Sequence, residues 1–578
     1  MHSILITLVA TFIFLIASCS PSTELDTYID GKLPVEINNV TPLPIHTSYP
    51  IQNSKYGGLL TLANRGDPPA GFDPSRTSSI ALHHVGGALF GPGNLVMRCR
   101  EDFYKICPNI AKKWVVDQSY AEWTFTLQDD IYWHDGKQLT VEDIQFWFQL
   151  SYYGIESKQK YRPPAYFKGE LGNIKSVDIL DDHRIRVTLN ERNPYFLDIL
   201  ANPRFKLAHP KHLVIESISN GNVSISPIEI GLIGLGPFKL DKYDTGSLIS
   251  LSRWNKYWEK SEGNKLPYLD NIDYVIMPDP FTMDVAFRTG KLDGGARGRA
   301  HYLTSERKAG YVKDLGEDVF FAETDGGNFR LAFNILKSGP WQDPYVRRAI
   351  SLWIDKPSSI NTVLGGFGWT TPNLNPPNIL MPIGRSNLIN WPKFDLEPLD
   401  QKREEARSLM TKAGYPNGFT MGHLCRSINP TPCEYLKFQL SGLGIDLKLN
   451  MVEEGQWNNA RGSADYDTQQ GRLTPSPIPE GTESVYGRYS NNPDAYAKHD
   501  DQRVDQMYRL LRNSLSSARR VELWRDIEEY LYVEQTYIIP IAESINVTPY
   551  RTFVKNLDIP PEDSHTYTDF TKVWIDID

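Results

Sequence analysis

Alternating apolar and polar positions predict several half-buried strands. In residues 122–127 (EWTFTL) and 183–189 (HRIRVTL), apolar side chains occupy every second position. A period of two places one face of a strand in a core and the other toward water. Residues 59–64 (LLTLAN), which follow two glycines, also have the composition of a strand. The body of the chain is therefore predicted to contain half-buried sheet from its first residues onward.

Apolar residues at helical spacing predict helices between these strands. Four of them have clear start signals, in which a short polar side chain precedes the apolar stripe. These signals are Thr140, Asp279, Asp343 and Asp400, and the fourth helix is predicted to end at Gly414. Longer helices are predicted near 501–515 and 518–533. Helix and strand signals alternate without an internal repeat, so the predicted class is α/β or α+β.

The N-terminus predicts export. Residues 4–16 (ILITLVATFIFLI) form an apolar stretch that is too short to span a bilayer comfortably but fits the core of a secretory signal. Ile16-Ala17-Ser18-Cys19 follows, and this pattern resembles the bacterial lipobox, in which the cysteine is lipidated. Residues 1–3 carry no Lys or Arg, unlike a typical signal. A plain signal peptide and an uncleaved membrane anchor therefore stay open as alternatives to lipidation of Cys19.

Composition narrows the classes of function. The 578 residues carry a net charge of −9, so the chain lacks the basic surplus of a nucleic-acid-binding protein. A chain of this length is expected to form two or three domains or lobes. Residues 20–56 are rich in Ser, Thr, Pro and Asn and are predicted to be a tether with a reach of roughly 30–35 Å.

Four cysteines besides Cys19 form two local pairs. They bracket the segments CREDFYKIC (Cys99 to Cys107) and CRSINPTPC (Cys425 to Cys433). Three pairings are possible, and the local one is predicted because each short loop brings its own two thiols together. An oxidising compartment allows such bonds. The spacing does not fit zinc, which favours two to four residues between cysteines with histidines nearby, so no metal is predicted.

Motifs of catalysis are absent from the sequence. It contains no G-x-S-x-G, H-E-x-x-H, P-loop or G-x-G-x-x-G pattern, and His83-His84 is its histidine cluster. Adjacent histidines point in different directions on a strand or a helix, so one metal ion rarely binds both. We therefore predict no enzyme and no cofactor, and a secreted hydrolase is the disfavoured alternative.

Residues 108–151 resemble the signature segment of family 5 extracellular solute-binding proteins, the peptide, dipeptide and nickel receptors of ABC importers. The matching features are a tryptophan strand, an aromatic strand that ends in W-H-D-G (133–136), and a helix that begins with T-V-E-D (140–143). Asp135-Gly136 makes a tight turn and Thr140 caps the helix, so the motif specifies fold and not ligand. Further matches follow in family order over about residues 57–557. They lie at 58–74, 234–243, 251–260, 266–295, 329–334, 343–356, 364–377, 409–419 and 440–449.

The resemblance implies a two-lobed α/β fold of the periplasmic-binding-protein type (class II), with an extra subdomain in the first lobe and a ligand cleft between the lobes. The expected division has five parts. They are a signal peptide (1–19), the tether (20–56), lobe I (57–95, 205–300 and 538–578), its subdomain (96–204) and lobe II (301–537). The chain is expected to cross between the lobes twice.

The resemblance also implies a function. The expected protein is an exported, lipid-anchored subunit that captures peptides or peptide-like solutes by lobe closure and delivers them to an ABC permease, as a monomer. The same fold could instead serve an oligosaccharide, an anionic metabolite, haem or a nickel chelate.

The site residues expected from the resemblance lie in separate segments. They are Asn64, Arg65, Asp67, Asp325, Asn328, Trp369, Trp457 and Arg472. The stretch 466–481 departs from the family because it has Arg472 where family members carry a tryptophan, and it lacks the aspartate that anchors a peptide amino terminus in oligopeptide receptors. A cation there favours an anionic group, although each of these residues can equally serve the fold. Asn334 and Arg347 are expected to fix backbone or to pair with a carboxylate, and not to contact ligand.

Overall fold

The structure is a computed structural model that describes most of the chain from residue 55 to residue 576. The described ranges are 55–77, 79–91, 94–100, 105–156, 161–162, 165, 171, 174–202, 205–222, 225–295, 303–370, 397–427, 429–473, 487, 495–557 and 568–576. The predicted signal segment, Cys19 and nearly all of the tether lie outside these residues. None of the helices within them has the length and apolar character needed to cross a membrane.

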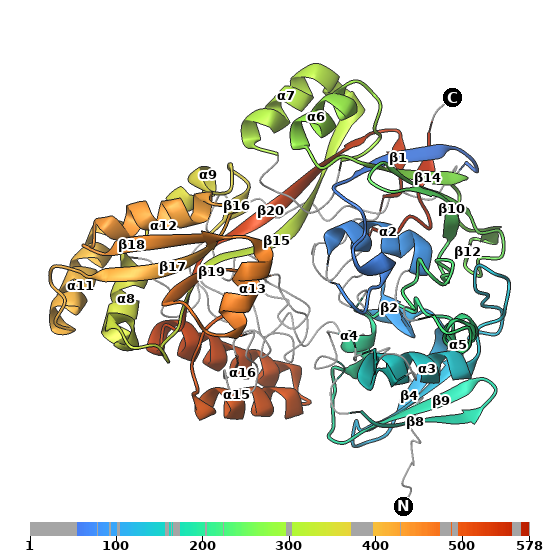
Figure 1. Ribbon diagram of the computed structural model, residues 1–578, viewed down its shortest axis with the longest axis horizontal. Coiled ribbons are helices and arrows are strands. Elements are labelled where there is room, and N and C mark those ends of the chain that lie inside the picture. Colours follow the sequence, from blue (N-terminus) through green and yellow to red (C-terminus); the bar gives the residue numbers. More distant parts are fainter. Residues whose placement is uncertain are drawn as a thin grey trace, which may run out of the picture. The chain divides into compact units, whose positions relative to one another are not determined.

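A four-stranded sheet is built from both ends of the first half of the chain (Figure 1). In chain order, the first of the four strands pairs in parallel with the fourth. The two other strand pairings in this sheet are antiparallel. Helix α2 (Ile80–Phe90) contributes to the same core. A Cβ on Gly234 or Gly236 would lie about 2 Å from a carbonyl oxygen of α2, so only glycine permits this close approach. In sheet order the strands are β1 (Leu59–Asn64), β14 (Asn271–Ile276), β11 (Leu248–Arg253) and β10 (Phe238–Asp244).

A second, antiparallel sheet of four strands carries the signature segment. Its strands have the predicted alternation, since every second residue of β5 and β9 is buried. Helix α3 (Val141–Tyr152) contributes to the same core and begins with a capping box between Thr140 and Asp143. In sheet order the strands are β4 (Ala111–Val116), β5 (Glu122–Leu127), β9 (Arg184–Leu189) and β8 (Ile174–Asp181).

The third sheet has six strands and two separate cores. Adjacent residues of β15 belong to different cores: Leu331 contributes to the core with α8, α11 and α12, and Ala332 to the core with α15 and α16. In sheet order the strands are β16 (Gly368–Trp369), β20 (Ile538–Arg551), β15 (Val319–Phe333), β19 (Thr468–Leu473), β17 (Thr420–Arg426) and β18 (Asp446–Val452). The helices are α8 (Pro344–Trp353), α11 (Leu399–Lys412), α12 (Thr431–Ser441), α15 (Gln502–Asn513) and α16 (Ser517–Glu529).

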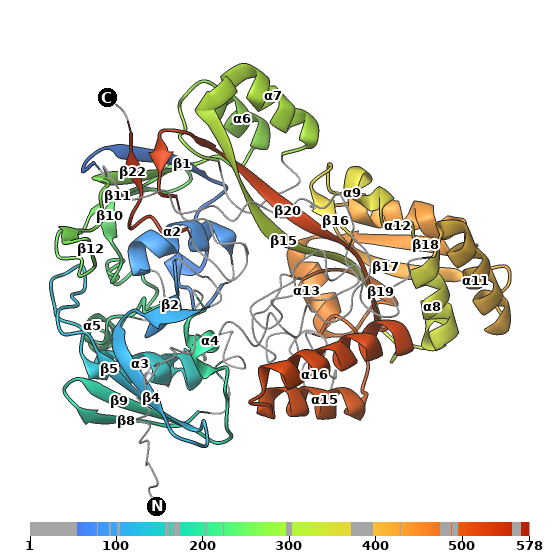
Figure 2. The same cartoon turned by 180° about the vertical axis from the view of Figure 1, so that it is seen from behind.

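Strands β15 and β20 connect the six-stranded sheet with the first sheet. They run side by side in both views (Figures 1 and 2) and pair from Val319 with Arg551 to Ala332 with Ile538. Ala322 and Tyr550 belong to the core of the first sheet. The pairing is irregular between residues 325 and 330, in the middle of β15, which is where a bend is expected. The strand pair β15–β20 thus contributes residues to the core of the first sheet and to the cores of the six-stranded sheet.

Shorter elements complete the described chain. The short strands are β2 (Val96–Arg98), β3 (Ile106–Pro108), β6 (Ile155–Glu156), β7 (Tyr161–Arg162), β12 (Lys260–Ser261), β13 (Asn264–Lys265), β21 (Val554–Lys555) and β22 (Trp574–Ile575). The remaining α-helices are α4 (Phe196–Leu200), α5 (Lys211–Ser219), α6 (Pro280–Arg288), α7 (Ser305–Leu315), α9 (Ser358–Thr362) and α13 (Glu454–Gly462). Single turns are η1 (Ala70–Phe72), η3 (Gly316–Asp318), η4 (Pro340–Gln342) and η5 (Tyr530–Glu534).

The predicted helix starts are confirmed, with one correction. The side chains of Asp279 and Asp343 accept hydrogen bonds from backbone N–H groups of α6 and α8. Asp400, by contrast, lies inside the first turn of α11, which begins at Leu399 after Pro398. The fixed φ of proline suits the entry to a helix, and a carboxylate one residue further still interacts favourably with the helix N-terminus.

Both predicted disulfides are present. Cys99 bonds Cys107 with a Cα–Cα distance of 5.0 Å, and Cys425 bonds Cys433 with a Cα–Cα distance of 6.4 Å. Each bond joins residues eight positions apart.

Asn334 and Arg347 fix backbone, as predicted. The Asn334 amide donates to the carbonyl oxygens of Ala464 and Tyr466. The buried Arg347 guanidinium donates to the carbonyl oxygens of Trp341, Gln342 and Gln535, each at 2.8 Å. Its contacts tie the start of α8 to the end of η5. Burial lowers the pKa of Arg347 to about 10, so the side chain stays charged at neutral pH.

Replacing Arg347 with methionine should destabilise the protein by about 3 kcal/mol or more, because three carbonyl oxygens lose their donor. Chemical denaturation followed by far-UV circular dichroism measures the change. Arg348→Met is the matched control, since Arg348 is the next residue of α8 and is partly exposed. Equal losses for the two variants would contradict the assigned role of Arg347.

His134, in the W-H-D-G motif, is buried in its neutral form. Its Nδ1 accepts from the N–H of Gly234 at 3.2 Å, and its Nε2 donates to the carbonyl oxygen of Gly236 at 3.0 Å. A proton added to Nδ1 would point at the N–H of Gly234, which is also a donor, so protonation would break this hydrogen bond. Burial, the largest cause, lowers the pKa of His134 to about 4. The folded pKa lies below the unfolded value of about 6.5, so the unfolded chain binds more protons and stability falls as pH drops from about 6.5 toward 4.

Between pH 7 and pH 5, His134 should therefore reduce the free energy of unfolding by about 2 kcal/mol. Urea denaturation at pH 5, 6 and 7 should show a shallower pH dependence in His134→Gln than in the wild type. His183→Gln, at an exposed position, serves as the control and should keep the wild-type slope. An unchanged slope in His134→Gln would refute the neutral, buried assignment.

Candidate functional site

The predicted residues of the loop after β1 hold that loop in place. The amide of Asn64 donates to the carbonyl oxygens of Gly66 and Ala81, both at 3.1 Å. The carboxylate of Asp67 accepts from the Tyr243 hydroxyl at 2.9 Å and from the N–H of Gly246. Arg65 lies between them and is partly exposed. These contacts give Asn64 and Asp67 a role in the fold, and ligand contact by the three residues stays a prediction.

Four other predicted residues lie on three strands of the six-stranded sheet. Asp325 and Asn328 lie on β15, Trp369 on β16 and Arg472 on β19. Glu543 of β20 pairs with both Asn328 and Trp369, and Phe329 pairs with Arg472. Segments more than 100 residues apart in sequence thus meet in the six-stranded sheet, from its edge strand β16 through β20 and β15 to β19. For Asp325, Asn328 and Arg472, the structure describes the position of each residue in its strand and not its side chain.

Sequence reasoning missed two buried ionisable residues, Glu543 and Arg330, which lie on the paired strands β20 and β15. Glu543 is fully buried, and its carboxylate accepts from the N–H of Gly327 at 2.9 Å. Arg330, also buried, is on β15. Burial lowers its pKa to about 10, and the nearby Tyr532 and Glu543 partly offset that effect. No motif in the sequence marks this pair, because it forms through pairing of strands that lie 200 residues apart.

Two arginines lie over the ring of Trp457, near the ends of strands in the six-stranded sheet. The guanidinium carbon of Arg426 lies 3.9 Å from the ring centroid of Trp457, and that of Arg461 lies 4.7 Å from it. Arg461 also lies 5.0 Å from the ring centroid of Tyr496. Trp457 is fully buried in a cluster with Leu424, whereas both arginines are partly exposed. Cation–π contact holds such side chains in place.

The carboxyl ends of three parallel strands, β17, β18 and β19, define this edge of the sheet. Strand β17 pairs in parallel with β18 and with β19, and Arg426 is its last residue. Helix α13, which carries Trp457 and Arg461, follows β18 directly. In α/β sheets the carboxyl ends of parallel strands are the usual position of a ligand. Trp457 was predicted as a wall of the site, while the two arginines were not predicted. Their available signals were an Arg at the end of an apolar strand and the i, i+4 spacing from Trp457 to Arg461.

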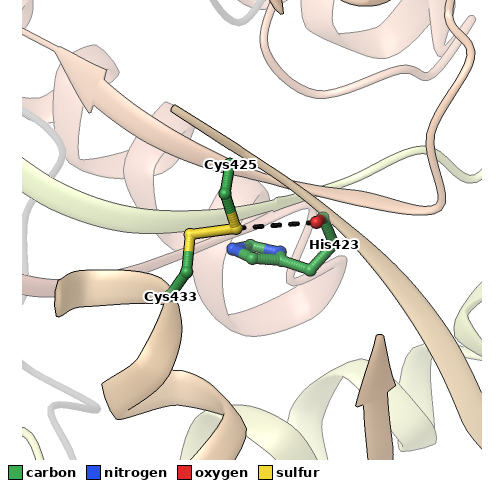
Figure 3. Close-up of side chains that lie close together, drawn as sticks. All are labelled: His423, Cys425 and Cys433. Carbon is green, nitrogen blue, oxygen red and sulfur yellow. Dashed lines mark hydrogen bonds between the residues drawn. A yellow bond between two sulfur atoms is a disulfide. The ribbon is translucent and has the colours of Figure 1, made fainter. Parts of the chain in front are cut away.

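A cluster of His423, Cys425 and Cys433 lies behind this edge (Figure 3). Their donor atoms lie within 4.8 Å of one another, but the two sulfurs are bonded to each other. Nδ1 of His423 lies 2.9 Å from the hydroxyl of Thr468 on β19. Burial lowers the pKa of His423 to about 3, so the imidazole is neutral. The cluster is therefore a disulfide packed against a neutral histidine.

A cavity of about 690 Å³ lies elsewhere, between α6 and α7. Phe281, Arg288, Arg307 and Gly310 are among the residues that line it. Its arginine Arg288 pairs with Asp284 and Asp314. None of the predicted ligand residues lines this cavity, so it is distinct from the sheet edge described above.

Curated proteins of similar sequence are binding proteins. The periplasmic oligopeptide-binding protein OppA of Haemophilus influenzae is 24% identical over 528 residues, which cover 87% of this chain and 92% of that protein. Di/tripeptide-binding protein 1 of Pseudomonas aeruginosa is 24% identical over 518 residues, covering 85% and 90%. Heme-binding protein A of Haemophilus influenzae is 24% identical over 504 residues, covering 80% and 83%.

Solved structures share the fold. AgaA from A. tumefacien R10, in complex with agropinic acid, has a TM-score of 0.70 and 22% identity, and the alignment covers 90% of this chain and 99% of that one. The dipeptide-binding protein from Pseudoalteromonas sp. SM9913, in complex with Met-Leu, has a TM-score of 0.70 and 18% identity, covering 90% and 100%. The predicted two-lobed α/β fold is thereby confirmed.

Residues 105–496, more than half of the chain, match the family model described as "Bacterial extracellular solute-binding proteins, family 5 Middle". Members of this family are binding proteins and not enzymes. The ordered motifs, the fold and this match lead to one conclusion: the chain belongs to the family 5 bacterial extracellular solute-binding proteins.

Proposed function

We propose that this protein is the exported substrate-binding subunit of an ABC importer and that it captures peptides or peptide-like solutes. Family membership and the names of relatives that bind oligopeptides, dipeptides and tripeptides support this role. The ligand would bind between two lobes connected by β15 and β20, and the closed form would dock on the permease. The requirement is that the ligand binds the closed state more tightly than the open state.

The observation that carries the ligand class is the Arg426–Trp457–Arg461 stack. Two guanidinium groups lie on one indole at the carboxyl edge of β17, β18 and β19. A guanidinium presents paired N–H donors that match the two oxygens of a carboxylate. A peptide has a carboxylate at its C-terminus. We therefore assign Arg426 and Arg461 as the anchor of the ligand carboxylate. Arg472, on neighbouring β19, adds a third cation to this part of the chain.

Anchoring to the membrane is the second part of the proposal. Cys19 would carry the lipid, residues 20–56 would form the tether, and the body would work as a monomer on the outer face of the membrane. One acyl chain binds a bilayer only marginally, whereas two or more give stable attachment. The two disulfides of the body are consistent with an oxidising, exported location.

Trialanine should raise the melting temperature of the purified protein, because a ligand that binds only the folded state stabilises it by about 2.7 kcal/mol at a concentration one hundred times its Kd. Differential scanning fluorimetry with peptides of two to five residues measures the effect, with maltotriose and free alanine as controls. Stabilisation by a sugar or an opine-like acid, without stabilisation by any peptide, would refute the peptide assignment.

Arg426→Ala should weaken trialanine binding roughly 10- to 150-fold, the loss expected when a charged hydrogen bond worth about 1.5–3 kcal/mol is removed. Binding of trialanine amide should change little, since the amide lacks the carboxylate. Isothermal titration calorimetry measures both.

Arg407→Ala is the matched control for that measurement. The Arg407 guanidinium also lies over a tryptophan, 4.9 Å from the ring centroid of Trp353, but it is on α11, away from the strand ends. Its loss should leave both affinities unchanged. Equal effects of Arg426→Ala on trialanine and its amide would show that Arg426 does not bind the carboxylate.

A further inference from the structure

The Cys425–Cys433 disulfide closes the segment that carries Arg426. Cys425 is the next-to-last residue of β17, and Cys433 is the third residue of α12. Both are fully buried. Arg426 follows Cys425 directly, so the covalent bond fixes the backbone at the start of the segment whose first side chain lies on Trp457.

Hydrogen bonds also hold the segment near its two ends. The N–H of Ser427 donates to the carbonyl oxygen of Val452 at 2.9 Å, and the Ser427 hydroxyl donates to the carboxylate of Glu453 at 2.8 Å. Near the other end, the N–H of Cys433 donates to the carbonyl oxygen of Pro430 at 2.9 Å. The two bonds of Ser427 are to the end of β18 and to the residue after it, and the bond of Cys433 is to a residue just before α12. The disulfide adds the direct link between β17 and α12.

The sulfur of Cys433 also contacts β19, the strand that carries Arg472. Sγ of Cys433 lies 3.4 Å from the side-chain oxygen of Gln470. Sγ of Cys425 lies 3.5 Å from the carbonyl oxygen of His423, whose ring lies beside the S–S bond (Figure 3). The disulfide therefore lies where β17, α12 and β19 meet. Those elements determine the position of Arg426 relative to β19.

We propose that the Cys425–Cys433 disulfide is a positioning element of the ligand site, which holds Arg426 over Trp457 and thereby sets the preference for ligands with a free carboxylate. This inference rests on the proposed function of Arg426. Preorganisation is the physical reason, because a guanidinium already held in its binding geometry loses less conformational freedom when ligand arrives. Opening the disulfide should lower affinity for the carboxylate and leave the rest of the ligand's contacts unaffected.

The chain contains a matched control. Cys99 and Cys107 are joined across the same separation of eight residues, but Cys99 directly follows β2 and Cys107 lies on β3. Since the closed loops have equal length, the two bonds restrict the unfolded chain equally in the chain-entropy model. A general loss of stability should therefore be similar for both pairs. A change in ligand preference should be specific to the pair beside Arg426.

Two double variants of the full chain test the proposal: Cys425→Ala with Cys433→Ala, and Cys99→Ala with Cys107→Ala. The first readout is amide hydrogen exchange of residues 426–433, which needs no ligand. The second is the ratio of the Kd of trialanine amide to the Kd of trialanine. The first variant should speed exchange in this segment and lower the ratio about tenfold. The second variant should leave the exchange in this segment and the ratio at their wild-type values.

Adding Arg426→Ala to each background tests whether the effect acts through Arg426. With Arg426 absent, opening the Cys425–Cys433 bond should no longer change the ratio, because coupled residues are not additive. If the alanine pair does not fold, phosphine reduction in the Cys99→Ala, Cys107→Ala background opens this disulfide alone in the described body, and the same two readouts apply.

Unchanged hydrogen exchange in residues 426–433 would overturn the proposal whether or not trialanine binds. Faster exchange with an unchanged ratio would reduce the disulfide to a purely structural role and would also overturn it. A wild-type protein that binds neither trialanine nor its amide would contradict the proposed peptide function instead, and in that case the exchange measurement still decides whether the disulfide holds the segment.

Discussion

The hydrogen-bonded ladder between β15 and β20 is the interaction on which the rest of the structure depends. It joins residues more than 200 positions apart and spans nearly the full length of both strands. At one end Ala322 and Tyr550 belong to the core of the first sheet, and at the other Leu331 and Ile541 belong to the core beside α8. Both hydrophobic cores of the six-stranded sheet contain residues of β15 and β20, so each is complete only when this non-local pairing has formed. Pairing between distant segments is intrinsically slow.

The ladder also explains why charged and polar groups can be buried near it. Glu543, on β20, accepts from a backbone N–H of β15 at the place where the pairing becomes irregular. Arg347 donates to three carbonyl oxygens of residues that lie outside the strands and α-helices. Buried polar groups are stable only when they are paired. These residues thus complete the hydrogen bonding of backbone that the fold leaves at the ends and irregularities of its elements.

The candidate ligand site, at the carboxyl ends of β17, β18 and β19, belongs to the same six-stranded sheet. Parallel pairing of β17 with β18 and β19 places three strand ends together, and the helix after β18 carries Trp457 back to the end of β17. The arginines on Trp457 are therefore positioned by topology and by cation–π contact. The Cys425–Cys433 bond joins β17 to α12, and Cys425 directly precedes Arg426. Rigid elements and a covalent link together support the groups that we assign to the ligand.

Local patterns in the sequence determined much of this protein. Alternation predicted β5 and β9, and capping residues predicted the starts of α3, α6 and α8, because these features depend on neighbours along the chain. Short spacing likewise predicted both disulfides. The ordered family motifs indicated the two-lobed class. What only the tertiary structure decided was which distant strands pair, and hence the positions of Glu543 and of Arg426 relative to Trp457. Those contacts follow from sheet order and register, which depend on residues hundreds of positions apart and leave no local signal.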